Sequence, residues 1–160
     1  MDTASWCADV INLGDIVQDS DDSVDDEERE SRFSHFIELV DGVMGDEPDD
    51  VFRCLVASIR DQDDYGAHDA VLSALLRFEP QRLGRLAAME MPTVILRVPD
   101  FAGDLLGQLA FRADDVVAAF NRAAASLDET QRTVIRAFVA AEEEDGWLGN
   151  PSQRGRIRVQ

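Results

Sequence analysis

The chain has 160 residues and a formal net charge of −18, and all 15 of its basic residues are arginine. No apolar run approaches the roughly 18 to 20 residues that a membrane span needs, and the N-terminus lacks the basic region and long apolar core of a secretory signal. A negative field of this size repels nucleic acid and anionic lipid and favours a basic protein surface. We therefore expect a cytoplasmic protein whose partner is neither nucleic acid nor membrane.

The acidic residues are concentrated at the start of the chain. Residues 1–50 hold 17 of them against Arg29 and Arg32, a net of −15, so residues 51–160 carry only −3. This asymmetry has two interpretations: it provides an acidic docking surface, or it keeps a small protein soluble.

Helical spacing of apolar residues organises the first half of the chain. A run of acids that cannot be buried interrupts it, and Ser23, with Asp26 three residues on, is the predicted N-cap of the helix that follows. In chain order the pattern predicts a helix over 3–17, an acidic loop near 19–26, a second helix that Gly45 and Pro48 end, a helix over 49–60 and a central helix over 65–78.

Prolines mark the expected helix starts in the second half of the chain. Pro80 and Pro99 are each expected to open a helix, and Pro92 to kink or restart the first of these. A helix over 113–125 follows, and Asp128, with a glutamine three residues later, predicts a capping box for the last helix.

Similar helices recur along the chain. Val71-Leu72-x-x-Leu75 matches Leu105-Leu106-x-x-Leu109 at an offset of 34 residues. Recurrence of this kind predicts an all-α fold, an antiparallel helix-hairpin array of the HEAT-like α-solenoid type with about seven or eight helices. We expect a single helical domain over 1–148 and a basic tail over 149–160. This tail is either flexible or folded back as an extended strand against the acidic surface.

The sequence contains only incomplete metal-binding patterns and no recognisable catalytic motif. The stretch from Asp61 to Gly66 begins like a calcium loop, but Leu72 stands where a bidentate glutamate is required. His35 and His68 lie far from each other and from the cysteines, which does not suit a transition-metal site. We expect neither enzymatic activity nor a cofactor.

Cys7 and Cys54 are the only cysteines. Without a secretory signal, two cysteines are more often buried thiols than a disulfide, which is the alternative.

Protein-binding surfaces therefore remain as candidate sites. The acidic link 61–64 leads into Tyr65, the only tyrosine, and a tyrosine beside carboxylates is suited to anchor basic side chains. The alternative is that the link only caps the next helix. Trp147, after the last helix, is either an interface anchor or a hydrophobic plug. The candidate partner-binding residues are Asp21, Asp22, Asp25, Asp26, Asp61, Asp63, Asp64, Tyr65 and Trp147.

The region from Tyr65 to Phe138 resembles the helical, HEAT-like immunity proteins of bacterial polymorphic-toxin systems. The similarity lies in YGAHDAVLSALLRFEP, in MPTVILRVPDFAGDLLGQL with Pro92 and Pro99, and in AAFNRAAASLDETQRTVIRAFV with Arg132 and Arg136. It does not include the acidic run at 19–30.

The resemblance implies a small protein that binds a cognate toxin domain and occludes its active surface without catalysis. The charge suggests a toxin with a basic surface, with a nuclease as one candidate. We expect a monomer or a weak dimer. The alternative function is that of a generic helical adaptor or scaffold in a cytoplasmic complex.

Overall fold

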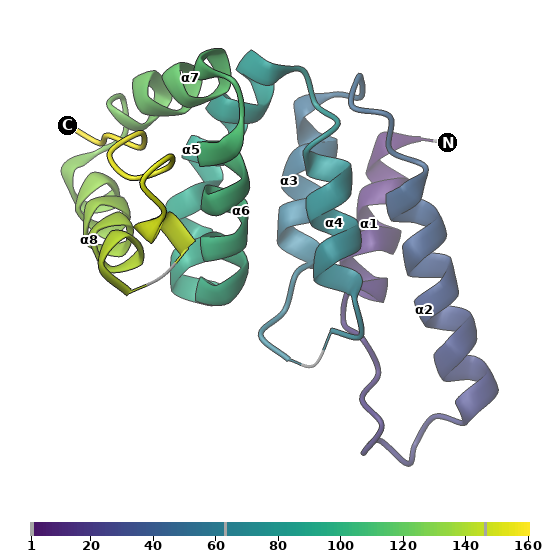
Figure 1. Ribbon diagram of the computed structural model, residues 1–160. Helices are drawn as coiled ribbons and strands as arrows, with labels where there is room; N and C mark the ends of the chain where they lie inside the picture. The colour runs from purple at the N-terminus through teal and green to yellow at the C-terminus, as the bar shows by residue number, and fades with distance from the viewer. Residues whose placement is uncertain (1, 63, 146) are drawn as a thin grey trace. The chain divides into compact units, whose positions relative to one another are not determined.

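A computed structural model describes residues 2–62, 64–145 and 147–160 of the chain (Figure 1). Within these residues all regular secondary structure is helical, which confirms the predicted all-α array. The eight α helices and one 3-10 helix of this part fall into two compact units, Met1–Phe78 and Glu79–Gln160. The single domain expected over 1–148 stays a prediction, because two compact units can belong to one domain. None of the described helices is both long and apolar enough to cross a bilayer.

Four helices build the N-terminal unit: α1 (Thr3–Leu13), α2 (Asp26–Asp41), α3 (Asp49–Ser58) and α4 (Ala67–Leu75). α1 packs most closely against α3, and α2 packs against α1 and α4. At the centre, the rings of Phe52 and Phe78 meet edge to face with centroids 5.3 Å apart. The other large side chains of this core are Val10, Phe36, Val40, Leu55, Val71 and Leu75.

Gly14 explains why α1 is shorter than predicted. A Cβ at this position would lie 2.3 Å from the carbonyl oxygen of Ser58, so glycine allows the end of α1 to approach the end of α3. The helix stops at Leu13, four residues before the predicted end, and the chain continues in a non-helical conformation that buries Ile16.

The start of α2 also differs from the prediction. Ser23 is engaged in a local turn, where both its amide and its hydroxyl donate to Asp21, at 3.0 and 2.6 Å. Asp25 takes the capping position instead and accepts a hydrogen bond from the Glu28 amide at 2.8 Å. The acidic first turn that follows suits the positive end of the helix dipole.

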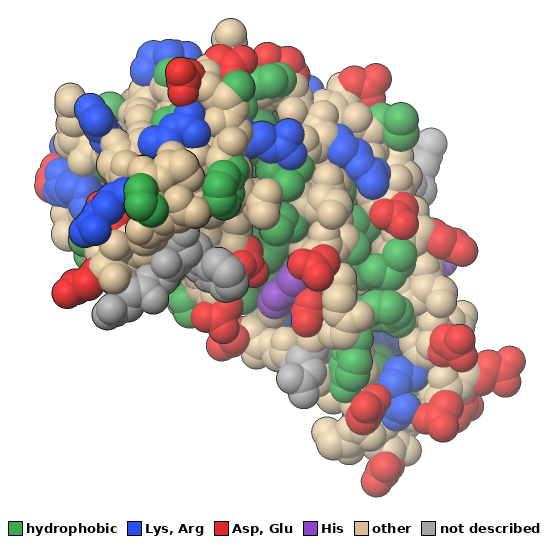
Figure 2. Space-filling model, viewed as in Figure 1, with side chains coloured by type: hydrophobic (Ala, Val, Ile, Leu, Met, Phe, Trp, Pro, Cys, Tyr) green, Lys and Arg blue, Asp and Glu red, His purple; other side chains and the backbone are tan. Residues whose placement is uncertain are grey.

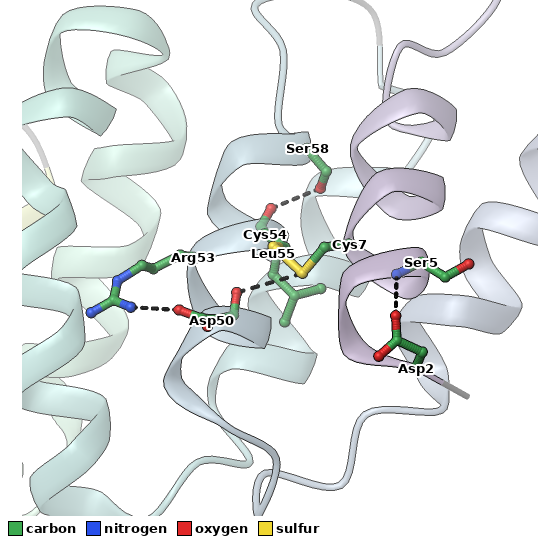
Figure 3. The surroundings of a disulfide bond; sticks show 8 residues. All are labelled: Asp2, Ser5, Cys7, Asp50, Arg53, Cys54, Leu55 and Ser58. Atoms are coloured by element: carbon green, nitrogen blue, oxygen red, sulfur yellow. Dashed lines mark hydrogen bonds and ion pairs between the residues drawn. A yellow bond between two sulfur atoms is a disulfide. The ribbon is translucent and has the colours of Figure 1, made fainter.

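Cys7 and Cys54 form a disulfide that joins α1 to α3 (Figure 3). Their Cα atoms lie 5.4 Å apart although the residues are separated by 47 positions. The prediction of buried thiols is therefore wrong, because close packing of α1 on α3 brings the two side chains together and leaves both half-buried. In a chain-entropy model, closing a loop of this length stabilises the fold by about 4 kcal/mol.

The C-terminal unit contains α5 (Pro80–Arg97), α6 (Pro99–Phe111), α7 (Asp114–Ala124), α8 (Glu129–Asp145) and the short η1 (Trp147–Gly149). α5 and α7 make its closest helix pair. At their contact a Cβ on Gly84 would lie 2.3 Å from the Val116 carbonyl oxygen.

Pro92 does not restart the helix. α5 runs through it without a break, and Pro92 is buried. Proline removes one intrahelical hydrogen bond, but the apolar face that continues through Met91 and Val94 is buried on both sides of it.

The tail folds back onto its own unit, so neither expected outcome, a flexible tail or an extended strand against the acidic surface, describes it. Gln153 is buried and donates from Nε2 to the Gly107 carbonyl at 3.0 Å. The Arg156 guanidinium donates to the carbonyls of Ala110 and Arg112 at the end of α6. Ile157 is only 4% exposed. The tail therefore closes the C-terminal unit rather than covering the acidic run.

Candidate partner-binding surface

The acidic run between α1 and α2 is locally ordered by its own hydrogen bonds. Asp21 accepts the two bonds from Ser23 described above, and these bonds, with smaller contributions from Arg29 and Arg32, lower the pKa of Asp21 below its ordinary value. Arg29 pairs with Asp26 at 2.6 Å and donates to the carbonyl of Asp21 at 3.3 Å. Asp21 is thus charged at neutral pH and held in place.

The second acidic stretch is the link between α3 and α4, and hydrogen bonds of Asp64 and His68 fix its conformation. The Asp64 carboxylate accepts a bond from the His68 amide at 2.7 Å, and the His68 ring lies 3.0 Å from the Arg60 carbonyl oxygen. The alternative reading of the link as a helix cap therefore holds for Asp64.

Tyr65 sits in an unusual conformation within this link. Its φ is 50°, in the left-handed region, and Gly66 follows with φ of 93°. A bulky residue in that region costs free energy. Its side chain is nevertheless 49% exposed. Backbone strain on an exposed aromatic residue is typical of residues kept for binding rather than for packing.

The fold brings the two acidic stretches together, although they are separated by 46 positions. The Asp19 amide donates to the Tyr65 hydroxyl at 3.4 Å, and Gln62 donates from Nε2 to the Ile16 carbonyl at 3.1 Å. A shallow depression lies between them, lined by side chains that include Asp15, Asp21, Arg32 and Gln62. Figure 1 draws both stretches at the same end of the N-terminal unit.

We call the side chains of this end the acidic surface: Asp19, Asp21, Asp22, Asp25, Asp26, Asp61, Asp64 and Tyr65. All are exposed except Asp64, which is half-buried. Figure 2 shows acidic side chains gathered at the lower right, over the acidic run and the start of α2.

The charge of the protein resides almost wholly in the unit that carries this surface. Residues 1–78 contain 21 acidic residues and five arginines, a net of −16, whereas residues 79–160 contain 12 acidic residues and ten arginines, a net of −2. The acidic field is therefore a property of one unit rather than of the whole chain, which favours docking over general solubility as its interpretation.

Two of the predicted residues cannot be placed on this surface. Asp63 lies outside the described residues. Trp147 belongs to η1 in the C-terminal unit, and its side chain is likewise outside what the structure describes. Two further residues, Asp19 and Gln62, join the two acidic stretches and were not among the predicted partner-binding residues. Asp19 had a signal, since it begins the acidic run, whereas Gln62 had none.

Cys54 and His68, which could in principle serve catalysis or metal binding, make structural contacts instead. Cys54 is bonded to Cys7, and His68 contacts the link as described. Across residues 2–62, 64–145 and 147–160, no group of three or more His, Cys, Asp or Glu side chains is arranged to hold a metal ion. What the site offers is a shaped, charged surface.

Comparison with protein-family models, with curated proteins and with solved structures finds no match to this chain. The resemblance to helical immunity proteins therefore stays a hypothesis that rests on the residues quoted for it.

Proposed function

We propose that this protein binds a cognate bacterial toxin domain and neutralises it by covering a basic active surface, without catalysis. The observation that carries the proposal is the meeting of two acidic stretches around exposed Tyr65, in a unit with a net charge of −16. The resemblance to immunity proteins supplies the class of partner, and a nuclease is one toxin whose substrate cleft would be basic.

Two physical effects would make this surface an inhibitor. The acidic field accelerates encounter with a basic partner and orients it, an effect that weakens as salt screens the charges. Tyr65 then supplies a large, partly apolar contact at the centre of the carboxylates, of the kind that dominates interface energies. The strained backbone at Tyr65 presents the ring to solvent before the partner arrives.

The alternative function, an adaptor or scaffold in a protein complex, has its own supporting observation. The C-terminal unit is nearly neutral, and among its described residues three large apolar side chains are exposed, Met89 at 41%, Leu96 at 77% and Phe111 at 60%. An adaptor needs a second docking surface, and these residues are candidates for one.

Co-expression tests the proposal. The neighbouring genes are first searched for a toxin-like C-terminal domain, whose absence would favour the adaptor. Such a domain is then expressed alone, with this protein, and with a variant carrying Asp22→Asn, Asp61→Asn and Tyr65→Asn. We expect growth to be rescued, and a complex to co-purify, with the natural protein, and rescue to weaken with the variant. Absence of rescue by the natural protein would refute the toxin inhibitor and favour the adaptor. Equal rescue by both would refute the acidic surface as the binding site.

The cytoplasm is the proposed place of action, as expected for a protein that protects its own cell from a toxin. The Cys7–Cys54 disulfide is the observation against it, because disulfides persist mainly in oxidising compartments. Alkylation of free thiols in intact host cells decides between the two: modified cysteines support the cytoplasm, and protected cysteines support an oxidising compartment.

A further inference from the structure

The acidic surface is built mainly from two segments that meet at Tyr65, residues 15–22 and residues 60–66, which we call its two halves. Their like charges repel each other. Residues 15–22 carry Asp15, Asp19, Asp21 and Asp22, and residues 60–66 carry three more aspartates. Arg60 is the only basic residue within these two segments, and Arg29 and Arg32 of α2 offset part of the charge of Asp21 from outside them. Like charges at the protein surface destabilise a close approach, and they do so most at low ionic strength.

Three hydrogen bonds join the segment 60–66 to the segment 15–22 and to the end of α1. Arg60 reaches the Ile11 carbonyl at 3.3 Å, Gln62 reaches the Ile16 carbonyl at 3.1 Å, and the Asp19 amide reaches the Tyr65 hydroxyl at 3.4 Å. The bonds from Arg60 and Gln62 are partly buried and the bond from the Asp19 amide is exposed, and each contributes only modestly to net stability. Burial of Ile16 adds one apolar contact between them.

A covalent bond joins the two helices from which the segments continue. Residues 15–22 continue directly from α1, and residues 60–66 continue directly from α3. The Cys7–Cys54 disulfide holds α1 against α3. The close contact of Gly14 with Ser58 keeps the C-terminal ends of the two helices together as well. Both cysteines are half-buried, so a small reductant has access to the bond.

We propose that the Cys7–Cys54 disulfide is a redox-sensitive clamp that keeps the two halves of the acidic surface together. A dithiol reductant transfers two electrons and two protons to this bond, giving two thiols on the protein and a disulfide on the reductant. The oxidised chain presents one continuous acidic surface, and in the reduced chain repulsion separates the halves. The inference gives the proposed function its regulation and rests on that function for its biological use.

Hydrogen exchange of the full chain, followed by mass spectrometry, tests the clamp without any partner. The oxidised protein and the protein treated with dithiothreitol are compared at about 10 mM and about 1 M salt, where the Debye length falls from about 30 Å to about 3 Å. In the reduced protein at low salt we expect peptides that contain the Asp19 amide, which donates to the Tyr65 hydroxyl across the two segments, to exchange about tenfold faster or more at that amide. We expect high salt to restore most of the protection.

Two controls keep the result specific. The double variant with Cys7→Ser and Cys54→Ser should match the reduced protein with and without dithiothreitol. Peptides from α5 and α7 should be unchanged throughout, which shows that the C-terminal unit remains folded.

Three outcomes would overturn the clamp. One is equal exchange in the oxidised and reduced proteins at low salt. Another is fast exchange in the reduced protein that high salt does not reverse, because repulsion would then not be its cause. The third is loss of protection throughout residues 1–78, which would make the disulfide a general staple. Each is independent of the co-expression result, so failure of the toxin hypothesis and failure of the clamp can be told apart.

Discussion

At the scale of single residues, substitution of Tyr65 should affect stability and partner binding differently. Asparagine adopts the left-handed conformation more readily than tyrosine, so Tyr65→Asn should leave the free energy of unfolding unchanged or raise it by about 0.5 to 1 kcal/mol. The same change removes the exposed ring from the acidic surface and should weaken partner binding about tenfold or more. Urea denaturation and titration calorimetry with the partner measure the two effects.

Tyr65→Phe is the matched control for that prediction. It keeps the ring and the backbone strain but removes the hydroxyl that accepts the Asp19 hydrogen bond. We expect it to bind nearly as well as the natural protein. A clear loss of stability in Tyr65→Asn would mean that the ring packs more than its 49% exposure indicates.

At the scale of elements, the contact between α5 and α7 depends on the absence of a side chain at Gly84. In Gly84→Ala the new Cβ would meet the Val116 carbonyl oxygen at 2.3 Å and the Ala119 Cβ at 2.9 Å. Because both neighbours belong to a packed helix, the helices must separate. We expect a loss of about 1 to 3 kcal/mol in the free energy of unfolding, measured by urea denaturation.

Gly149→Ala, in the same unit, is the control for Gly84→Ala. Its Cβ would meet nothing closer than 3.8 Å, so we expect little change in stability. Equal stabilities of the two variants would contradict the close approach of α5 and α7.

At the scale of the whole molecule, the position of the charge should matter more than its amount. Asp22→Asn with Asp61→Asn changes the acidic surface by two charges, and Asp100→Asn with Glu144→Gln makes the same change in the C-terminal unit. All four side chains are exposed. At low salt we expect the first pair to slow association with a basic partner several-fold more than the second, measured by stopped-flow fluorescence.

The difference between the two pairs should vanish at about 1 M salt, where exposed charges are screened. If both pairs slowed association equally, the total charge would be the cause and the acidic surface would have no special role.

The helical architecture could be predicted from the sequence because its causes are local. Apolar residues at helical spacing, the capping box at Asp128 and the prolines that open α5 and α6 act within a few residues of themselves. Errors arose where packing or a competing local hydrogen bond intervened, as in the bonds of Ser23 to Asp21. Gly14 ends α1 against Ser58, and buried side chains on both sides of Pro92 keep α5 continuous.

The sequence by itself determined the all-α fold, the number of helices and the excess of acid near the N-terminus. Only the tertiary structure decided that Cys7 bonds to Cys54, that the tail closes its own unit, and that Asp19 meets Tyr65. The physical reason is distance along the chain. Helix formation depends on residues three and four positions apart, whereas these contacts join residues about 46 positions apart and exist only after the helices have packed.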